Sequence, residues 1–155
     1  MKNNLGKIIS INKDLYFLYD NREVFPGTVR GKLKNIKLTV GYNVYFNKET
    51  KTIESVLDRK NTLVRPLVSN IDKLFIVVST KVPDFSTYLL DKFIVLSEVN
   101  NITPIIVVTK LDLVTKKEKK EILNTLKYYK KIGYKVYKNT DKRKIKKELK
   151  GKVCA

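Results

Sequence analysis

The first third of the chain alternates short apolar, β-rich runs with polar, turn-forming residues. Asn12-Lys13-Asp14 and Pro26-Gly27 are such turns, and apolar residues do not recur there at helical spacing. Closely spaced short strands predict a small barrel. A five-stranded OB-type barrel fits this pattern, and an SH3-like barrel remains an alternative on the pattern alone. The expected strands are residues 6–11, 15–19, 29–33, 44–46 and 52–57.

The pattern changes near residues 63–66, after which apolar strands alternate with segments of helical length. This alternation is typical of a parallel α/β sheet. We therefore expect two domains, a barrel over residues 1–64 and an α/β domain over residues 65–155. The expected strands of the second domain are residues 73–79, 104–108 and 134–137, and its expected helices are residues 84–100, 115–131 and 142–150.

Local signals mark the second helix of this domain and the end of the chain. Thr115 followed by Glu118 has the pattern of a capping box, and Gly133 fits a left-handed residue directly after a helix. Residues 153–155 have the character of a new strand. A sheet that stopped there would leave an exposed edge and an unfinished layer, so we expect the sequence to be truncated.

The charge distribution indicates an anionic partner. The net charge is +18, and it is concentrated in residues 1–65 and 113–155, with a nearly neutral segment between them. Lysine and arginine neutralise phosphates and release counterions, so nucleic acid is the natural partner. The bias is also what an AT-rich genome would produce, because lysine far outnumbers arginine. The charge alone therefore leaves RNA binding and a merely solvated surface both open.

Several functional classes are excluded by composition. With one cysteine, Cys154, and no histidine, the chain can form neither an internal disulfide nor a Cys/His zinc site, and histidine-dependent catalysis is impossible. The apolar runs are too short to span a bilayer, and the N-terminus does not lead into a signal-peptide core. We expect a soluble, cytoplasmic protein, monomeric and without a membrane partner.

The segment Thr109-Lys110-Leu111-Asp112 carries the most specific chemistry. It follows a buried strand and precedes a capped helix, at the carboxyl end of a parallel strand, where such folds bind ligands. Guanine presents two hydrogen-bond donors on one edge, and a fixed carboxylate such as Asp112 accepts both. Lys110 would lay its methylene stem along the base and keep its ammonium group in water. The alternative is that Asp112 is a turn residue and Lys110 a solvated one.

These residues, together with several blocks in the same order, resemble the RsgA (YjeQ) family of circularly permuted, ribosome-dependent GTPases. In this family the guanine-specificity motif precedes the phosphate loop, so the resemblance implies an N-terminal portion only. No G-x-x-x-x-G-K-S/T sequence is present. The matching blocks are Arg30-Gly31-Lys32-Leu33, Val40-Gly41, Leu57-Asp58-Arg59-Lys60-Asn61, Leu63-Val64-Arg65-Pro66, Ser69-Asn70-Ile71-Asp72-Lys73 with the strand after it, and residues 83–91 and 109–113.

The resemblance implies a fold made of a five-stranded OB-type barrel followed by a partial parallel α/β, P-loop GTPase-like domain that lacks the P-loop. It implies a GTP hydrolase of late small-subunit maturation that binds ribosomal RNA through the barrel and GTP or GDP through the permuted domain. Mg²⁺ and zinc would be held only by the missing C-terminal part, and this chain alone would be inactive. An RNA-binding module with no nucleotide-dependent activity is the alternative.

The resemblance also implies site residues. The guanine contacts would be Thr109, Lys110, Leu111 and Asp112, with Asn139 and Thr140 as the second guanine loop. The sequence departs from the family at Thr109, where many GTPases have Asn, and around residues 138–140, which do not match cleanly. The candidate RNA contacts of the barrel are Arg30, Lys32, Lys34, Tyr42 and Tyr45, and ordinary barrel packing is the alternative for the two tyrosines.

Overall fold

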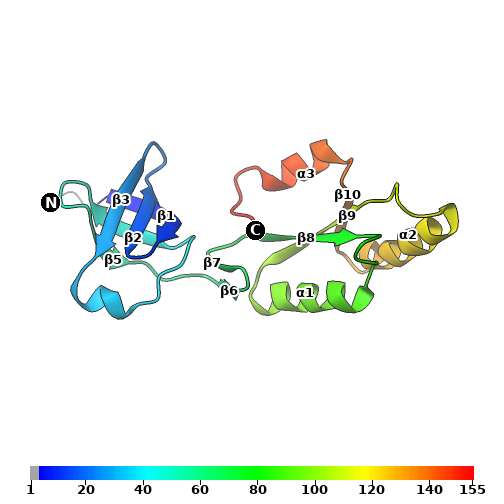
Figure 1. The fold of residues 1–155 in the computed structure, drawn as a ribbon, viewed down its shortest axis with the longest axis horizontal. Helices are drawn as coiled ribbons and strands as arrows, with labels where there is room; N and C mark the ends of the chain where they lie inside the picture. Colours follow the sequence, from blue (N-terminus) through cyan, green and yellow to red (C-terminus); the bar gives the residue numbers. More distant parts are fainter. Residues whose placement is uncertain (1–3) are drawn as a thin grey trace. The chain divides into compact units, whose positions relative to one another are not determined.

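The computed structural model describes residues 4–155, which form two compact units (Figure 1). The first ends at Ile71, and the second runs from Asp72 to Ala155. Each unit has its own sheet and its own buried apolar residues.

The first unit is a closed barrel of five strands. Its order is β1-β2-β3-β5-β4, and β1 also pairs with β4, which closes the sheet. All pairings are antiparallel except β3 with β5. The prediction of a five-stranded OB-type barrel is confirmed. The strands are β1 (Asn4–Asn12), β2 (Leu15–Tyr19), β3 (Val24–Val29), β4 (Asn43–Asn47) and β5 (Thr52–Val56).

The third strand differs from its prediction. We expected residues 29–33, but β3 runs from Val24 to Val29 and includes Pro26. Pro26 lies opposite Phe17 of β2, whereas β3 meets β5 only at Thr28 and Val29. At Pro26 the strand has a neighbour on one side only, so the missing N–H costs no ladder bond. The short 3₁₀ helix η1 (Gly31–Asn35) follows, opened by Gly31 at a φ of 58°.

A hairpin of β6 (Thr62–Val64) and β7 (Leu67–Ser69) completes the first unit. It is joined to the chain before β4 by a bridge between Val40 and Val68. Gly41 has a φ of 94°, and a Cβ there would lie 2.0 Å from the carbonyl oxygen of Ser69. Only glycine permits this approach, which explains the residue at that position.

The second unit is a parallel α/β sheet, as the alternation predicted. Its strand order is β10-β9-β8. The last residues lie beside β8, because Lys73 bridges to Cys154 and the Phe75 amide donates to the Ala155 carbonyl at 2.8 Å. The strand expected at residues 153–155 therefore begins as predicted. The elements are β8 (Lys73–Ser79), α1 (Thr87–Val99), β9 (Thr103–Thr109), α2 (Lys116–Lys131), β10 (Lys135–Lys138) and α3 (Lys142–Leu149).

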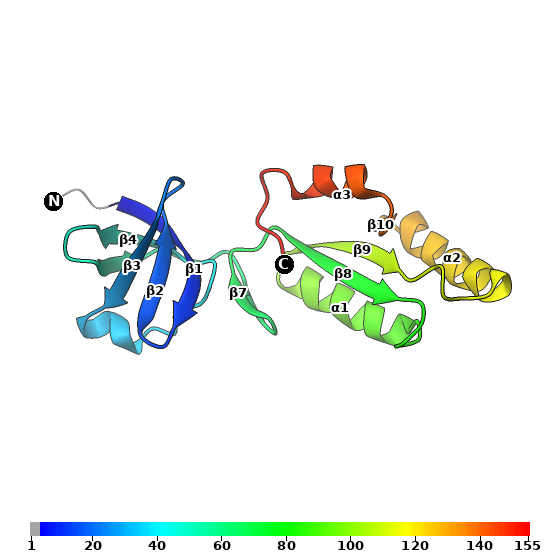
Figure 2. The ribbon, with the colours of Figure 1, turned by 45° about the horizontal axis from the view of Figure 1, so that its top comes forward.

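The helices cover both faces of this sheet. Figures 1 and 2 show α1 and α2 on one face and α3 on the other. Right-handed crossovers require this arrangement, because the chain moves from β8 through β9 to β10 and then returns past β8. Successive residues of β10 point to opposite faces of the sheet. Val136 is buried toward α2, whereas the Tyr137 hydroxyl bonds to Glu148 of α3 at 2.9 Å.

The helix ends follow the predicted signals. Thr115 and Glu118 form the predicted capping box, and Gly133 follows α2 with a φ of 109°. Helix α1 begins later than predicted, because the Ser86 hydroxyl accepts from the Leu89 amide and caps it there. No helix among residues 4–155 has the length and apolar character needed to cross a bilayer.

Candidate nucleotide-binding site

Three loops of the second unit meet at the carboxyl ends of the parallel strands. Ser79 of β8 is in register with Thr109 of β9, and Val108 with Lys138 of β10. The backbone amide of Asn139 donates to the Val108 carbonyl at 2.9 Å. The two predicted guanine loops therefore lie side by side, at the sheet edge where parallel α/β folds bind ligands.

The turn at Lys110 is held by the loop that follows β8. Lys110 has a φ of 58°, and its carbonyl accepts from the buried Thr80 hydroxyl at 2.6 Å. Its ammonium group donates to the carbonyls of Lys81 at 3.2 Å and Val82 at 2.5 Å. We expected the ammonium group to stay in water with the stem along the base. The structure adds that this group bonds to the neighbouring loop, so Lys110 also fixes the shape of the turn.

Thr109 also holds the strand end. Its hydroxyl donates to the Val78 carbonyl at 3.2 Å, which occupies its only hydrogen. In this arrangement Thr109 can accept a hydrogen bond but has none to give to a base acceptor. Leu111 is half-buried, and the turn around it is closed by the Leu113 amide, which donates to the Lys110 carbonyl at 3.0 Å.

Asp112 is exposed, and its carboxylate makes no hydrogen bond or ion pair with the described residues. The prediction required that packing does not bury this carboxylate and that it faces the crevice at the strand ends. Its exposure meets the first condition, and its role in guanine binding stays a prediction. A carboxylate has two acceptor oxygens and no hydrogen to give, so this group suits a ligand edge with two donors. Among residues 4–155, His, Cys, Asp and Glu side chains do not gather in groups of three that could hold a metal ion.

The second loop contributes exposed polar groups. Asn139 and Thr140 are both exposed, and the Thr140 carbonyl accepts from the Lys142 amide at 2.8 Å. The loop is closed by Asp141, whose carboxylate accepts from the Lys138 amide at 2.9 Å. This backbone hydrogen bond lowers the pKa of Asp141. The side chains of Asn139 and Thr140 thus remain available beside the end of β9.

Hydrogen bonds of Glu118 fix the end of the Asp112 loop at the start of α2. The Glu118 carboxylate accepts from the Thr115 amide at 2.7 Å, from the Thr115 hydroxyl at 2.8 Å and from Lys81 at 3.2 Å. These bonds, led by that of the backbone amide, lower the pKa of Glu118 to about 2. Because Lys81 lies in the loop after β8, these bonds link that loop to the start of α2. The Asp112 loop is therefore held at both ends, as preorganised binding requires.

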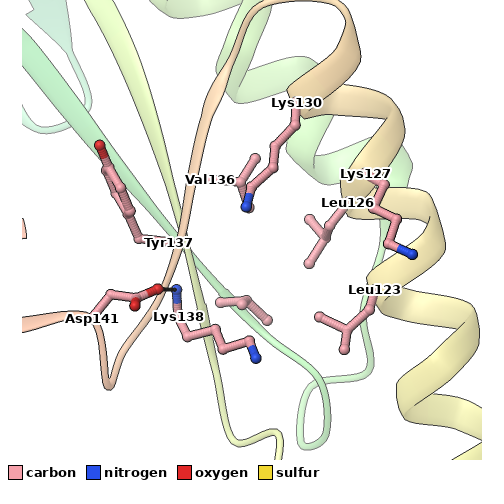
Figure 3. A pocket seen from close by; sticks show the side chains of 9 residues that line it. Leu123, Leu126, Lys127, Lys130, Val136, Tyr137, Lys138 and Asp141 are labelled. Atoms are coloured by element: carbon pink, nitrogen blue, oxygen red, sulfur yellow. Dashed lines mark hydrogen bonds between the residues drawn. The ribbon is translucent and has the colours of Figure 1, made fainter. Parts of the chain in front are cut away.

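A hollow of about 220 Å³ lies beside the second loop, between β10 and α2 (Figure 3). Its floor is apolar, with Val108 and Val136 from the sheet and Leu126 from the helix, and lysines stand at its rim. Thr109, Lys110 and Asp112 do not line it. This pocket is therefore separate from Thr109, Lys110 and Asp112 of the predicted guanine site.

The predicted RNA contacts of the barrel divide into two groups. Arg30, Lys32 and Lys34 are exposed on or next to η1, and Tyr45 of β4 is exposed. The prediction that Tyr42 contacts RNA is wrong, because Tyr42 is a core residue that is only 5% exposed.

The contacts of Tyr42 explain this difference. Its hydroxyl accepts from the Arg59 guanidinium at 2.6 Å, and that group also lies over the ring, 5.6 Å from its centroid. A ring held in this way has no face free for base stacking.

The barrel presents a second group of candidate RNA contacts, which the sequence did not indicate. OB-type barrels bind oligonucleotides on the face of β2 and β3 and through the loops β1–β2 and β4–β5. Here Tyr19 of β2 is exposed, and the two loops present the exposed lysines Lys13 and Lys51. Correct bounds for the third strand would have indicated this face, since β3 pairs with β2 from Val24 to Gly27.

Comparison with known proteins identifies the family. The family model described as RsgA GTPase matches residues 51–155, which is more than half of the chain. The chain belongs to the RsgA GTPase family. Among curated RsgA proteins, the small ribosomal subunit biogenesis GTPase RsgA 2 of Listeria innocua serovar 6a is 39% identical over 96% of this chain. The RsgA of Halalkalibacterium halodurans is 38% identical over 85% of it.

Solved RsgA-type structures share the fold. YjeQ from Thermotoga maritima matches 99% of this chain with a TM-score of 0.86 and 31% identity, and YloQ, a circularly permuted GTPase, matches 99% with 0.79 and 32%. The chain covers 54% and 47% of the two curated RsgA proteins and 59% and 58% of the two solved chains. It thus spans about half the length of its relatives, as their N-terminal portion.

Proposed function

We propose that this chain is the N-terminal portion of a GTPase that acts in late maturation of the small ribosomal subunit. In this proposal the barrel binds ribosomal RNA and the second unit recognises the guanine base. Family membership and the names of the RsgA relatives support the overall role. The guanine site is supported by the loop geometry of this chain.

The observation that carries the proposal is the free carboxylate of Asp112. It is exposed in the loop that follows β9, which is held by Thr80 and Lys110, and Asn139 bonds to Val108 near the end of the same strand. Guanine offers this carboxylate a ring N–H and an exocyclic amine. Adenine has an acceptor in place of the ring N–H, so it would leave the carboxylate poorly paired. Hydrogen bonds to charged groups contribute about 1.5–3 kcal/mol each, enough for strong selection.

Phosphate binding in this proposal depends on residues outside this sequence. The 155 residues contain no G-x-x-x-x-G-K-S/T motif, whose backbone amides and lysine would surround the phosphates. We therefore propose that this chain recognises the base of a guanine nucleotide weakly and does not hydrolyse GTP.

The proposal predicts a base-specific NMR titration. In ¹H–¹⁵N spectra of the chain, GDP should shift amide resonances of residues 109–113 and 138–141, and ADP should not. Asp112→Asn should lose the response to GDP and gain one to xanthosine diphosphate. Xanthine has a carbonyl where guanine has its amine, and an asparagine amide can donate to it while accepting from the ring N–H.

The matched control is Glu121→Gln, an equal change of charge at an exposed position of α2. It should respond to GDP as the original chain does. Equal shifts with GDP and ADP, or shifts that Asp112→Asn leaves intact, would show that Asp112 does not select the base.

A further inference from the structure

One face of helix α3 packs against the sheet and bonds to it. Glu148 is buried, and its carboxylate accepts from Lys73 at 2.6 Å, Lys135 at 2.7 Å and the Tyr137 hydroxyl at 2.9 Å. Ile145 is half-buried on the same side. The only acidic residue of this helix is therefore turned inward and neutralised by lysines of β8 and β10.

The opposite face of α3 is a row of cations. Arg143, Lys146 and Lys147 recur at i, i+3 and i+4, which places them on one stripe of the helix, and Lys150, at i+7, is the C-cap residue that directly follows it. We call these four residues the basic stripe. All four are exposed, and none makes a hydrogen bond or ion pair with the described residues. The positive charge of the stripe is therefore not neutralised by any acidic side chain among the described residues.

Helix α2 shows what a mixed, solvated surface looks like in the same unit. Its lysines share the helix with Glu118, which bonds to Thr115 and Lys81, and with the exposed Glu121, so both signs of charge are present on it. A membrane surface does not suit α3, because an interfacial helix needs a free apolar face, and that face of α3 lies on the sheet. Figure 2 shows α3 alone on its side of the sheet.

We propose that the basic stripe binds RNA phosphates and forms a second RNA-contact surface, separate from the barrel. The stripe spans seven residue steps, or about 10 Å, which allows several cations to meet one phosphate backbone. Such contacts are independent of base sequence and position the protein on its RNA. The inference rests on the proposed function only in taking RNA as the partner.

The test compares two variants of the full chain with equal loss of charge. The first replaces Arg143, Lys146, Lys147 and Lys150 with Gln, and the control replaces Lys116, Lys117, Lys120 and Lys131 of α2, which are also exposed. Glutamine is a good helix former, so both should remain folded. The probe is a fluorescein-labelled RNA hairpin with a fully paired stem, and anisotropy gives the affinity across a salt series.

The stripe variant should bind the hairpin at least tenfold more weakly at low salt than the control variant. Its log–log salt dependence should be shallower by roughly 2 to 3, because each phosphate contact contributes about 0.7–0.9 to the slope. Equal weakening of both variants would overturn the proposal, since only net charge would then matter. An unchanged stripe variant would also overturn it.

A third variant separates this inference from the proposed function. Gln at Arg30, Lys32 and Lys34 removes barrel charge, and the GDP titration is run on every variant. If the barrel variant alone loses RNA binding, the basic stripe is refuted while the proposed function stands. If the original chain binds no RNA, both fail. If RNA binding depends on the stripe but GDP causes no shifts, only the guanine site is refuted.

Discussion

At the scale of single residues, Glu148 connects the two outer strands of the parallel sheet through one side chain. It bonds to Lys73 at the start of β8 and to Lys135 at the start of β10, with β9 between them. It thereby anchors the end of α3, whose first residue follows the second predicted guanine loop. The bond from Lys135, followed by that from Lys73, lowers the pKa of Glu148 to about 2.

This lowered pKa predicts a pH-dependent effect of Glu148→Gln. The pKa in the folded state lies below the ordinary value of a glutamate, 4.5, so the ion pairs stabilise the fold above pH 4.5 and are lost as the pH falls toward 2. At pH 7 the variant should lose about 1–3 kcal/mol of unfolding free energy. Urea unfolding followed by helical circular dichroism measures it, because the described α-helices all belong to the second unit.

The difference between the original chain and Glu148→Gln should shrink steadily between pH 4.5 and pH 2. Glu121→Gln removes an exposed charge on α2 and should change stability little at any of these pH values. A loss that is as large at pH 2 as at pH 7 would show that packing, not charge, accounts for the effect of Glu148.

At the scale of elements, the start of α2 supports both the helix and the candidate site. The capping box satisfies helix N–H groups through Thr115, and Glu118 also reaches Lys81 in the loop after β8. Asp112 lies between Lys110, which bonds to the loop after β8, and Thr115, which caps α2. A weaker cap should therefore loosen the loop that presents Asp112. Local helix chemistry and the binding geometry are therefore coupled.

Thr115→Ala should lower the unfolding free energy of the second unit by about 1 kcal/mol, the usual effect of losing such a cap. The matched control is Thr125→Ala in the same helix, whose hydroxyl bonds back to the Glu121 carbonyl at 3.2 Å. Alanine is the better helix former there, so the control should be neutral or slightly stabilised. Equal losses in chemical denaturation of the two variants would contradict a capping role for Thr115.

At the scale of the whole molecule, predictability follows the range of the contacts involved. The cap at Thr115 and the turn at Gly133 depend on neighbours within one helical turn, so the pattern sufficed. The alternation of strands and helices likewise predicted the parallel sheet. The presence of the Asp112 loop at a strand end followed from that same alternation and from the family resemblance.

Features set by distant residues could not be predicted in this way. Tyr42 packs in the barrel core, where Arg59 reaches its ring and hydroxyl, and Lys110 is held by carbonyls 28 and 29 residues earlier in the chain. The third strand was misplaced because Pro26 breaks a strand pattern unless its neighbours are known. Each of these depends on which segments pair across the barrel or sheet, and periodicity along the chain does not contain that information.

The separate cores of the two units predict that a core defect stays within its own unit. Phe46 is 1% exposed in the barrel core, with the Phe25 ring 5.6 Å away, centroid to centroid. Phe46→Ala should cost about 3–5 kcal/mol, a large part of the stability of a small domain. In ¹H–¹⁵N spectra the barrel resonances should broaden or collapse, while those of residues 72–155 stay dispersed.

The reciprocal variant is Ile106→Ala, which removes a fully buried side chain of β9 and should damage only the second unit. If either substitution unfolded both units together, the two would form one cooperative core, because independent units lose their signals one at a time. The same two variants also test the two binding activities. Phe46→Ala should weaken RNA binding yet keep the GDP-induced shifts. Ile106→Ala should abolish those shifts and the contribution of the basic stripe to RNA binding, while the barrel still binds RNA.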